Sequence, residues 1–426
     1  MMDRRQFGRL LLSTGAAAVA VPRLAAPAYA QAKPKVVVLG GGPGGATAAR
    51  YIAMDSKGAI EVTLVEPAAR FTTCFHSNLY LGGFKSLDEI THSYDKLASS
   101  HGIKIVAQAA AGVDRDKKQV RLADGSMLAY DRLVLAPGID LKYDSVPGWG
   151  QQHEQAMPHA WKAGPQTQLL KARLDAVPDG GLIVMIAPPN PYRCPPGPYE
   201  RVSMMAHALK RAGKTKARLV IVDPKESYSK QGLCQEGWEQ HYPGMVEWLG
   251  PKIHEGLKSV DPATNTVVTG FETYKAALVN VIPAQTAGRI ALDAGLANQT
   301  GFCPIDPANM KSTMDANIYI VGDACIPGDM PKSAFSANSQ AKVAAMMVRG
   351  ELTNAQTFPA RYTNTCWSMI ETDDAVKVGG RYEAKDGKIA AVETFISKTG
   401  ESADLRKQTQ QENIGWYQGI AADIFG

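Results

Sequence analysis

A glycine-rich turn near the start of the chain limits the folds that are open to it. The β-rich run 35–39 leads into Gly40, and Gly42 and Gly45 follow in the register G-x-G-x-x-G, ahead of a helix-like run at 46–52. In dinucleotide-binding domains the first glycine allows a tight turn, the second admits a pyrophosphate, and the third lets the helix pack on the strand. We therefore expect an α/β fold that opens with a Rossmann-type unit.

The next strand supports the same prediction. Residues 61–66 form a second β-rich run that ends in Glu66, about 20 residues after the glycines. A carboxylate at this position binds the adenosine ribose, and the helix N-terminus offers free N–H groups to the phosphates. A lone glycine motif is weak evidence, whereas strand, motif, helix, strand and terminal acid together indicate a dinucleotide.

Two later segments favour FAD over NAD. Residues 130–138 read as a strand and turn that end in Pro137 and Gly138, and residues 318–324 read as a strand followed by Asp323. Both segments are similar to those of two-domain flavin disulfide reductases, in which the aspartate contacts the ribityl and phosphate region of FAD. Each could alone be an ordinary buried strand, but their order makes FAD the expected cofactor.

The middle of the chain lacks the second glycine motif with which such reductases bind a nicotinamide nucleotide. The expected strands 180–186 and 218–223 are present, but the first runs into a proline-rich stretch at 187–196. Proline has a fixed φ and no N–H group, so it cannot replace glycines that permit close approach of a pyrophosphate. We expect electrons to leave by another route.

These segments predict the domain organisation. We expect an FAD-binding domain split between 31–145 and 290–350, and a second Rossmann-like domain without a nucleotide motif at 146–289. Residues 351–426 are expected to form a small α+β interface domain, in which a turn at 384–387 joins two strands.

The first 30 residues resemble a twin-arginine export signal. Arg4 and Arg5 precede a modest apolar stretch and a small-x-small site that ends at Ala30. The alternative, an N-terminal membrane anchor, is disfavoured because the apolar part is short, rich in alanine and interrupted at Pro22. Cleavage near Ala30 would place the mature chain in the periplasm, where disulfides persist.

Composition excludes several other functions. The formal net charge is +5, and removal of the expected signal leaves about +2, which gives no electrostatic case for nucleic acid. No later segment is apolar for long enough to be an integral membrane segment, and the eight histidines show no metal-ligand spacing. Of the six cysteines, Cys303 and Cys325 bracket one expected strand and could pair, while Cys234 has no evident mate.

From about residue 35 to the end, the chain resembles the flavoprotein subunit of flavocytochrome c sulfide dehydrogenase, a relative of the sulfide:quinone oxidoreductases. The segments that carry the resemblance are 71–74, 192–200, 330–333, 337–342, 364–366 and 416–417. The resemblance implies that Cys74 carries FAD through a thioether to the 8α-methyl group. It also implies that Cys194 and Cys366 form a disulfide over the flavin and that Glu200 is a catalytic acid/base.

Chemistry is consistent with these implied roles. Hydrosulfide can attack an exposed disulfide and release a thiolate, and Glu200 could manage the proton. Lys332, just before an expected helix start, is a candidate to stabilise reduced flavin. The alternatives are that Cys194 and Cys366 form a structural disulfide, that Cys74 is a buried thiol, and that Glu200 and Lys332 are merely solvated or capping groups.

The expected partner is a c-type cytochrome subunit that forms a heterodimer with this chain. No C-x-x-C-H attachment motif is present, so haem c is expected only on the partner. One alternative is a sulfide:quinone oxidoreductase, which would associate with a membrane and reduce quinone. Another is a flavin-bearing assembly protein of a sulfur-oxidation system. In such a protein, sulfide would not reduce the flavin.

Overall fold

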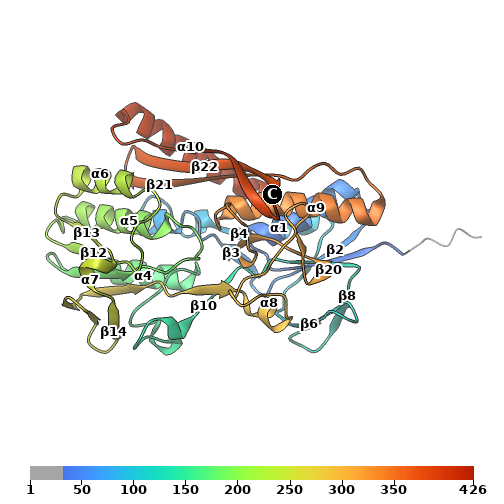
Figure 1. Ribbon diagram of the computed structural model, residues 1–426, viewed down its shortest axis with the longest axis horizontal. Helices are drawn as coiled ribbons and strands as arrows, with labels where there is room; N and C mark the ends of the chain where they lie inside the picture. Colours follow the sequence, from blue (N-terminus) through green and yellow to red (C-terminus); the bar gives the residue numbers. More distant parts are fainter. Residues whose placement is uncertain (1–31) are drawn as a thin grey trace, which may run out of the picture. The chain divides into compact units, whose positions relative to one another are not determined.

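The computed structural model describes residues 32–426, of which Pro34–Gly426 form one compact unit (Figure 1). The expected export signal and its cleavage near Ala30 lie outside the described residues.

A six-stranded sheet forms the first half of the fold. Its strands, in spatial order, are β19 (Lys311–Ser312), β20 (Asp315–Ile320), β9 (Arg132–Leu135), β1 (Lys35–Leu39), β2 (Glu61–Val65) and β5 (Lys104–Val106). All neighbours are parallel except β19 and β20. The central strands are continuous apolar runs because both of their faces are buried. The sheet brings together strands from both predicted parts of the FAD domain.

Helices and small sheets cover this first sheet. Helix α1 (Pro43–Ser56) packs against α9 (Ala334–Thr353), and the peripheral elements are α3 (Asp95–His101), α8 (Arg289–Asp293), β6 (Ala110–Asp114), β7 (Gln119–Leu122) and β8 (Met127–Ala129). Near the site lie α2 (Ser77–Gly82), β3 (Arg70–Thr72) and β4 (Thr91–Ser93).

The glycine motif has the predicted close contacts. Gly40 adopts a φ of +99°, and a Cβ there would lie 2.3 Å from the carbonyl oxygen of Ala136. A Cβ on Gly45 would lie 1.8 Å from the carbonyl oxygen of Gly40. Helix α1 starts directly after Gly42, three residues earlier than the sequence indicated, because Pro43 is well suited to the first helical position.

A four-stranded parallel sheet forms the second half. Its strands are β13 (Val246–Leu249), β12 (Arg218–Val222), β11 (Leu182–Ile186) and β17 (Leu278–Val281). Around it lie α4 (Pro165–Asp175), α5 (Gly197–Arg211), α6 (Gln231–His241), α7 (Pro251–His254), β14 (Leu257–Asp261), β15 (Thr266–Thr269) and β16 (Thr273–Lys275). The chain enters and leaves this half through the antiparallel pair β10 (Ile139–Leu141) and β18 (Gln285–Ala287). The α/β fold with two Rossmann-type halves is thus confirmed.

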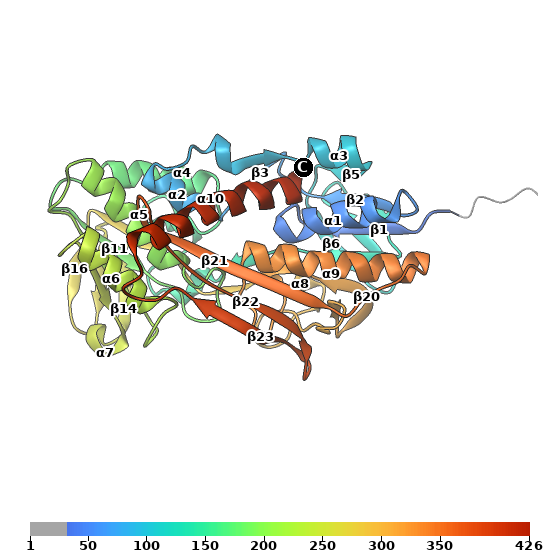
Figure 2. The ribbon, with the colours of Figure 1, turned by 90° about the horizontal axis from the view of Figure 1, so that it is seen from above.

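The C-terminal part is an antiparallel sheet followed by a long helix. Strands β21 (Arg361–Glu371), β22 (Asp374–Lys385) and β23 (Lys388–Ile396) precede α10 (Ala403–Phe425). The expected hairpin is present as β22 and β23. Strand β21 contacts α9 of the first half and both α5 and α6 of the second, so it bridges the two (Figure 2). Within residues 32–426, no helix is long and apolar enough to cross a membrane.

We predict that Gly45→Ala lowers the free energy of unfolding by about 2 kcal/mol or more, because its methyl group collides with the backbone of Gly40. It should also reduce the flavin bound per folded chain, since the collision displaces the turn. Urea unfolding and flavin absorbance measure the two effects. The control is Gly419→Ala in α10, where a Cβ meets nothing within 4 Å and alanine should stabilise by up to about 1 kcal/mol. Equal effects of the two changes would contradict the prediction.

Candidate functional site

A cleft of about 720 Å³ runs along the carboxyl ends of β1, β2 and β9. This volume lies in the range of roughly 300–1,000 Å³ that is typical of ligand sites. Of the predicted cofactor-binding residues, those that line the cleft are Gly40, Gly42, Glu66, Cys74, Pro137, Gly138 and Asp323. Gly45 lies behind the wall as a packing residue, and Lys332 lines neither this cleft nor the smaller cavity described below.

The residues of the cleft fit a dinucleotide such as FAD. The first turn of α1 has no side-chain cap, so its N–H groups are free for phosphate. A Cβ on Gly42 would lie no closer than 3.5 Å to any atom, at the ring of Phe71, so the backbone is open to the cleft. Oδ1 of Asp323 is buried without a hydrogen-bond partner, as expected for an acceptor of a ligand hydroxyl.

Glu66 is fixed at the end of β2 by the backbone. Its Oε2 accepts a hydrogen bond of 2.8 Å from the N–H of Gly41, and its Oε1 accepts one of 2.9 Å from Ala68. These contacts hold the carboxylate at the cleft, where carboxylates of Rossmann-type domains bind ribose.

A second, smaller cavity of about 70 Å³ holds the other predicted residues. Cys194, Cys366 and Glu200 all line it. Because a water needs about 10–15 Å³ by this measure, the cavity has room for a molecule of only a few heavy atoms. The cavity and the cleft share Cys74, Arg193 and Ala334, so they meet at these residues. The structure therefore brings the three predicted redox and anchoring cysteines to one place.

Cys194 sits in a tight turn between β11 and α5. Its backbone is left-handed with a φ of 57°, its N–H donates to the carbonyl oxygen of Lys332 at 2.7 Å, and its own carbonyl accepts from Gly197 at 2.8 Å. A Cβ on Gly197 would lie 2.9 Å from the Cys194 sulfur and from Trp161. Glycine at 197 is therefore required to seat this thiol.

Cys366 reaches the cavity from β21. Its Sγ lies 3.5 Å from Nδ2 of Asn364. Burial raises the pKa of the Cys366 thiol, and burial with the nearby Cys366 and Glu200 raises that of Cys194 well above its usual value. All six cysteines are unbonded, so a Cys194–Cys366 disulfide stays a prediction.

The remaining cysteines are buried away from the cavity. Cys303 and Cys325 lie side by side through an isolated parallel bridge, and both carry free thiols. Cys234 is buried in α6. The pairing of these residues stays open.

Glu200 differs from a solvated surface group. It lies in the first turn of α5, where its Oε2 accepts a hydrogen bond of 2.8 Å from Nδ2 of Asn78. Its Oε1 accepts one of 3.1 Å from the N–H of Met369. Burial raises the pKa of this carboxyl, so it can exchange a proton closer to neutral pH than an exposed glutamate does.

Lys332 directly precedes the N-cap of α9. Its Nζ donates to the carbonyl oxygen of Asp323 at 2.8 Å and to that of Cys325, and it lies 4.0 Å from the centroid of the Phe302 ring. The neighbouring Ser333 does cap α9, through a hydrogen bond of 3.0 Å from the N–H of Ser336. The ammonium of Lys332 is thus engaged behind the cleft wall, and a contact with flavin stays a prediction.

Several polar groups at the small cavity were missed by the sequence reasoning. His76 Nδ1, Trp161 Nε1, Asn413 Nδ2 and Trp416 Nε1 are buried without a hydrogen-bond partner, and all four residues line the cavity. Burial lowers the pKa of His76 to about 4, so its imidazole is neutral. Arg193 was also missed, although its position next to Cys194 was a signal for it.

In the second half, side chains of the protein itself bind the carboxylate that follows β12. Asp223, fully buried after β12, accepts hydrogen bonds from the hydroxyl of Tyr199 at 2.6 Å and from Nε1 of Trp248 at 3.0 Å. Nζ of Lys225 lies 2.6 Å from its other oxygen. A carboxylate held in this way is not free for the ribose of a second nucleotide.

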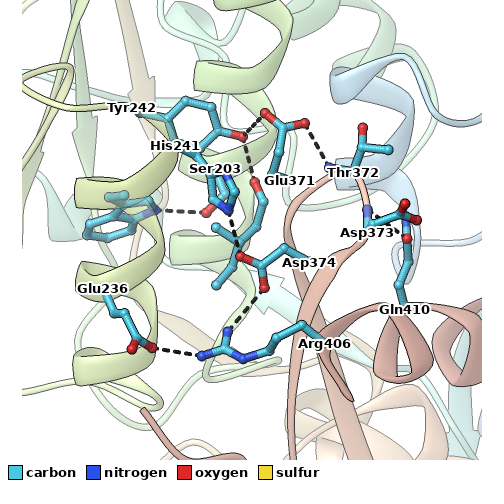
Figure 3. A network of polar contacts seen from close by, with 12 residues as sticks. Ser203, Glu236, His241, Tyr242, Glu371, Thr372, Asp373, Asp374, Arg406 and Gln410 are labelled. Atoms are coloured by element: carbon cyan, nitrogen blue, oxygen red, sulfur yellow. Dashed lines mark hydrogen bonds and ion pairs between the residues drawn. The ribbon is translucent and has the colours of Figure 1, made fainter. Parts of the chain in front are cut away.

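A polar network anchors the end of β21 (Figure 3). Arg406 of α10 donates to Asp374 at 3.1 Å and to Glu236 of α6 at 2.7 Å, and His241 lies 2.8 Å from the other oxygen of Asp374. The hydroxyl of Tyr242 donates to Glu371, the last residue of β21. The strand that carries Cys366 is therefore tied to α6 and α10.

Family models match three parts of the chain. Residues 167–283 match the central part of the flavoprotein chain of sulfide dehydrogenase (flavocytochrome c), and residues 358–425 match flavocytochrome c sulphide dehydrogenase, flavin-binding. Residues 34–173 match pyridine nucleotide-disulphide oxidoreductases.

Individual relatives agree with these matches. The chain is 22% identical over 360 residues to a mitochondrial sulfide:quinone oxidoreductase of Mus musculus, which covers 79% of this chain and 74% of that protein. It is 26% identical over 397 residues to a probable ferredoxin reductase, CtmF, of Castellaniella defragrans, with 85% and 90% covered. The solved sulfide:quinone oxidoreductase of Aquifex aeolicus has the same fold, with a TM-score of 0.71, 17% identity and 92% of each chain covered.

The fold and the cleft define an FAD-binding oxidoreductase of the flavin disulfide reductase type. Within that class, the chain belongs to the flavocytochrome c sulfide dehydrogenase flavoproteins, a sulfide-oxidising family related to the sulfide:quinone oxidoreductases.

We predict that Arg406→Met lowers the free energy of unfolding by about 3 kcal/mol, because it leaves the buried carboxylate of Asp374 without its cation. Chemical denaturation measures the change. The control is Lys407→Met, which removes an exposed ion pair with Asp373 and should change stability by less than about 0.5 kcal/mol. A neutral effect of the Arg406 change would contradict the anchoring role of the network.

Proposed function

We propose that this protein oxidises sulfide through a redox-active disulfide between Cys194 and Cys366 and passes the electrons through FAD to a c-type cytochrome subunit. The observation that carries the proposal is that both cysteines and Glu200 line one small cavity, which meets the FAD cleft at Cys74. We further propose that the protein is exported to the periplasm, as its first 30 residues indicate.

The side chains of the cavity suit a small sulfur nucleophile. Hydrosulfide is small enough for a space of about 70 Å³, and an attack on the disulfide forms a persulfide and frees a thiolate. Glu200, with its raised pKa, receives the proton that H₂S loses as it becomes hydrosulfide. FAD, when bound, accepts two electrons and can release them one at a time to a haem. The buried walls of the cavity limit the access of water to the sulfur atoms.

Cys74 is the proposed point of covalent attachment for FAD. It lies where the cavity meets the cleft, so its sulfur is at the flavin end of the cofactor site. Burial raises the pKa of its thiol, while the positive charge of Arg193 acts in the opposite direction. Arg193 would therefore assist Cys74 as a nucleophile.

The electron acceptor separates two candidate functions. The matched family models name flavocytochrome c, which favours a cytochrome subunit. The relatives from Mus musculus and Aquifex aeolicus are sulfide:quinone oxidoreductases, which keeps quinone as the second candidate.

We predict that anaerobic addition of sulfide bleaches the flavin absorbance of the purified protein. Cys194→Ser and Cys366→Ser should each slow this bleaching by at least about a hundredfold, because neither variant can form the disulfide that sulfide opens. Stopped-flow absorbance measures the rate. Cys303→Ser changes a buried cysteine that faces neither Lys230 nor the two cavity cysteines; it is the matched control and should bleach as the wild type does.

Two results would contradict the proposal. If the folded, FAD-loaded wild type does not bleach, the cysteine pair is structural and a non-enzymatic role leads. If the bleached protein transfers electrons to a quinone analogue faster than to a c-type cytochrome, the quinone reductase reading replaces the cytochrome one.

We also predict that flavin remains with the polypeptide after acid precipitation of the wild type and is released from Cys74→Ala. Fluorescence of the washed pellet and the mass of the intact chain measure attachment. The change should leave noncovalent FAD in the native variant, because the glycine turn and Asp323 are untouched. Release of flavin from the wild type would show that Cys74 is an ordinary thiol.

A further inference from the structure

Lys230 is a buried cation beside the cysteines, and the function proposed above gives it no role. It directly precedes α6, has a left-handed backbone with a φ of 64°, and is 4% exposed. Its Nζ donates to the carbonyl oxygen of Cys366 at 3.1 Å and to the hydroxyl of Ser368 at 2.6 Å. Its hydrogen-bond partners are thus neutral, and no ion pair joins it to any carboxylate of residues 32–426.

An ammonium in this position needs a negative charge nearby. Burial of an unpaired charge is costly, so buried lysines either lose their proton or lie beside an anion. The titratable groups that face Lys230 are Cys366 on β21, Cys234 on α6, Glu200 on α5 and Cys194 in the turn before α5. Burial lowers the pKa of Lys230, and among these neighbours Cys366 acts most strongly in the opposite direction.

Of the two cavity cysteines, Cys366 has the surroundings that better stabilise a thiolate. Nδ2 of Asn364 lies 3.5 Å from its sulfur, and Oδ1 of that amide accepts a hydrogen bond of 2.5 Å from Ser333. The serine hydroxyl therefore favours the orientation in which Nδ2 is the amide atom nearer to the sulfur, with Oδ1 at 3.8 Å. For Cys366, the Asn364 hydrogen bond and the charge of Lys230 oppose the rise in pKa that burial causes. Glu200 adds to that rise at Cys366 but is the smallest of the named influences there. For Cys194, the neighbours Cys366, Glu200 and Cys74 add to the rise in pKa, and the opposing charge of Lys230 is the smallest of the named influences.

We propose that Lys230 is a positioning residue whose buried ammonium, together with the amide of Asn364, stabilises the thiolate of Cys366 relative to that of Cys194. This inference rests on the proposed function. The ammonium acts through the adjacent peptide and through space, and it contacts neither the substrate nor the cofactor site.

The difference between the two cysteines predicts which sulfur is attacked and which one leaves as the thiolate. Hydrosulfide forms a bond to Sγ of Cys194, the Cys194–Cys366 bond breaks, and its electron pair leaves on Sγ of Cys366. The products are a persulfide on Cys194, which keeps the proton of the hydrosulfide, and a thiolate at Cys366. The disulfide gains the two electrons that the incoming sulfur loses, so the step needs no other reactant. A better stabilised leaving thiolate departs faster, which favours attack at Cys194.

The test measures the acidity of each cysteine. The FAD-loaded protein is reduced anaerobically with a phosphine, alkylated with iodoacetamide between about pH 5 and pH 10, and digested for mass spectrometry of each cysteine. In the wild type, the midpoint of Cys366 should lie below that of Cys194. Lys230→Met should raise the Cys366 midpoint by about one pH unit, which is about tenfold less alkylation below the midpoint.

Two controls separate charge from structure. Lys230→Arg keeps the charge and should restore most of the wild-type midpoint. Cys303 and Cys325, which do not face Lys230, should label alike in all variants. Thermal unfolding shows whether each variant is folded. If Lys230→Met is not folded, Lys230→Gln replaces it. The difference between the alkylation midpoints of Cys366 and Cys194 in the wild type then also tests the role of Lys230.

The possible failures are distinct. If Cys194 is the more acidic cysteine of the wild type, or if the Cys366 midpoint is unchanged in a folded, charge-free variant, the role of Lys230 is wrong while the proposed function stands. If the protein before reduction contains no reducible bond between Cys194 and Cys366, the proposed function itself fails, and the role of Lys230 fails with it.

Discussion

The packing of β21 across both Rossmann-type halves is the constraint on which the candidate site depends. Cys194 belongs to the second half and Cys74 to the first, whereas Cys366 comes from the C-terminal sheet. Because β21 lies on α9 and on α5 and α6 together, it brings the third cysteine to the other two. Arg406 pairs with Asp374, the first residue of β22, and with Glu236 of α6, so these ion pairs hold the turn at which β21 ends.

The fold was predictable because its signals are local. Gly40 and Gly45 must be glycines, because a Cβ at either position would lie 1.8–2.3 Å from a backbone oxygen. The spacing of the motif in the sequence reflects this requirement. The apolar runs that end in Glu66 or precede Asp323 are also local signals, because a parallel strand that is buried on both faces is a continuous apolar run. The hairpin of β22 and β23 followed from its turn residues.

The site was predictable only in part, because it depends on contacts between distant segments. The cysteines were singled out through a family resemblance, but no local rule places Cys366 beside Cys194. Lys332 was expected at the cofactor; its ammonium donates to the carbonyl groups of Asp323 and Cys325, and its contact with flavin stays a prediction. Lys230 gave no signal, since a lone lysine before a helix is ordinarily solvated. Burial is a property of the whole fold, and it places Lys230 beside Cys366 and Lys332 beside Cys325.

The buried carboxylate of Asp223 has a consequence for the whole electron path. In a two-domain reductase, the second Rossmann-type domain binds the nicotinamide nucleotide with which the flavin exchanges electrons. Here Tyr199 and Trp248 donate to one oxygen of that acid and Lys225 lies at the other, so the acid is not free to bind a nicotinamide ribose. Within the function proposed above, the flavin would then exchange electrons only with the sulfur pair and with the final acceptor. The direction of electron flow is then set by the potentials of those two couples alone, independent of the reducing state of a nicotinamide pool.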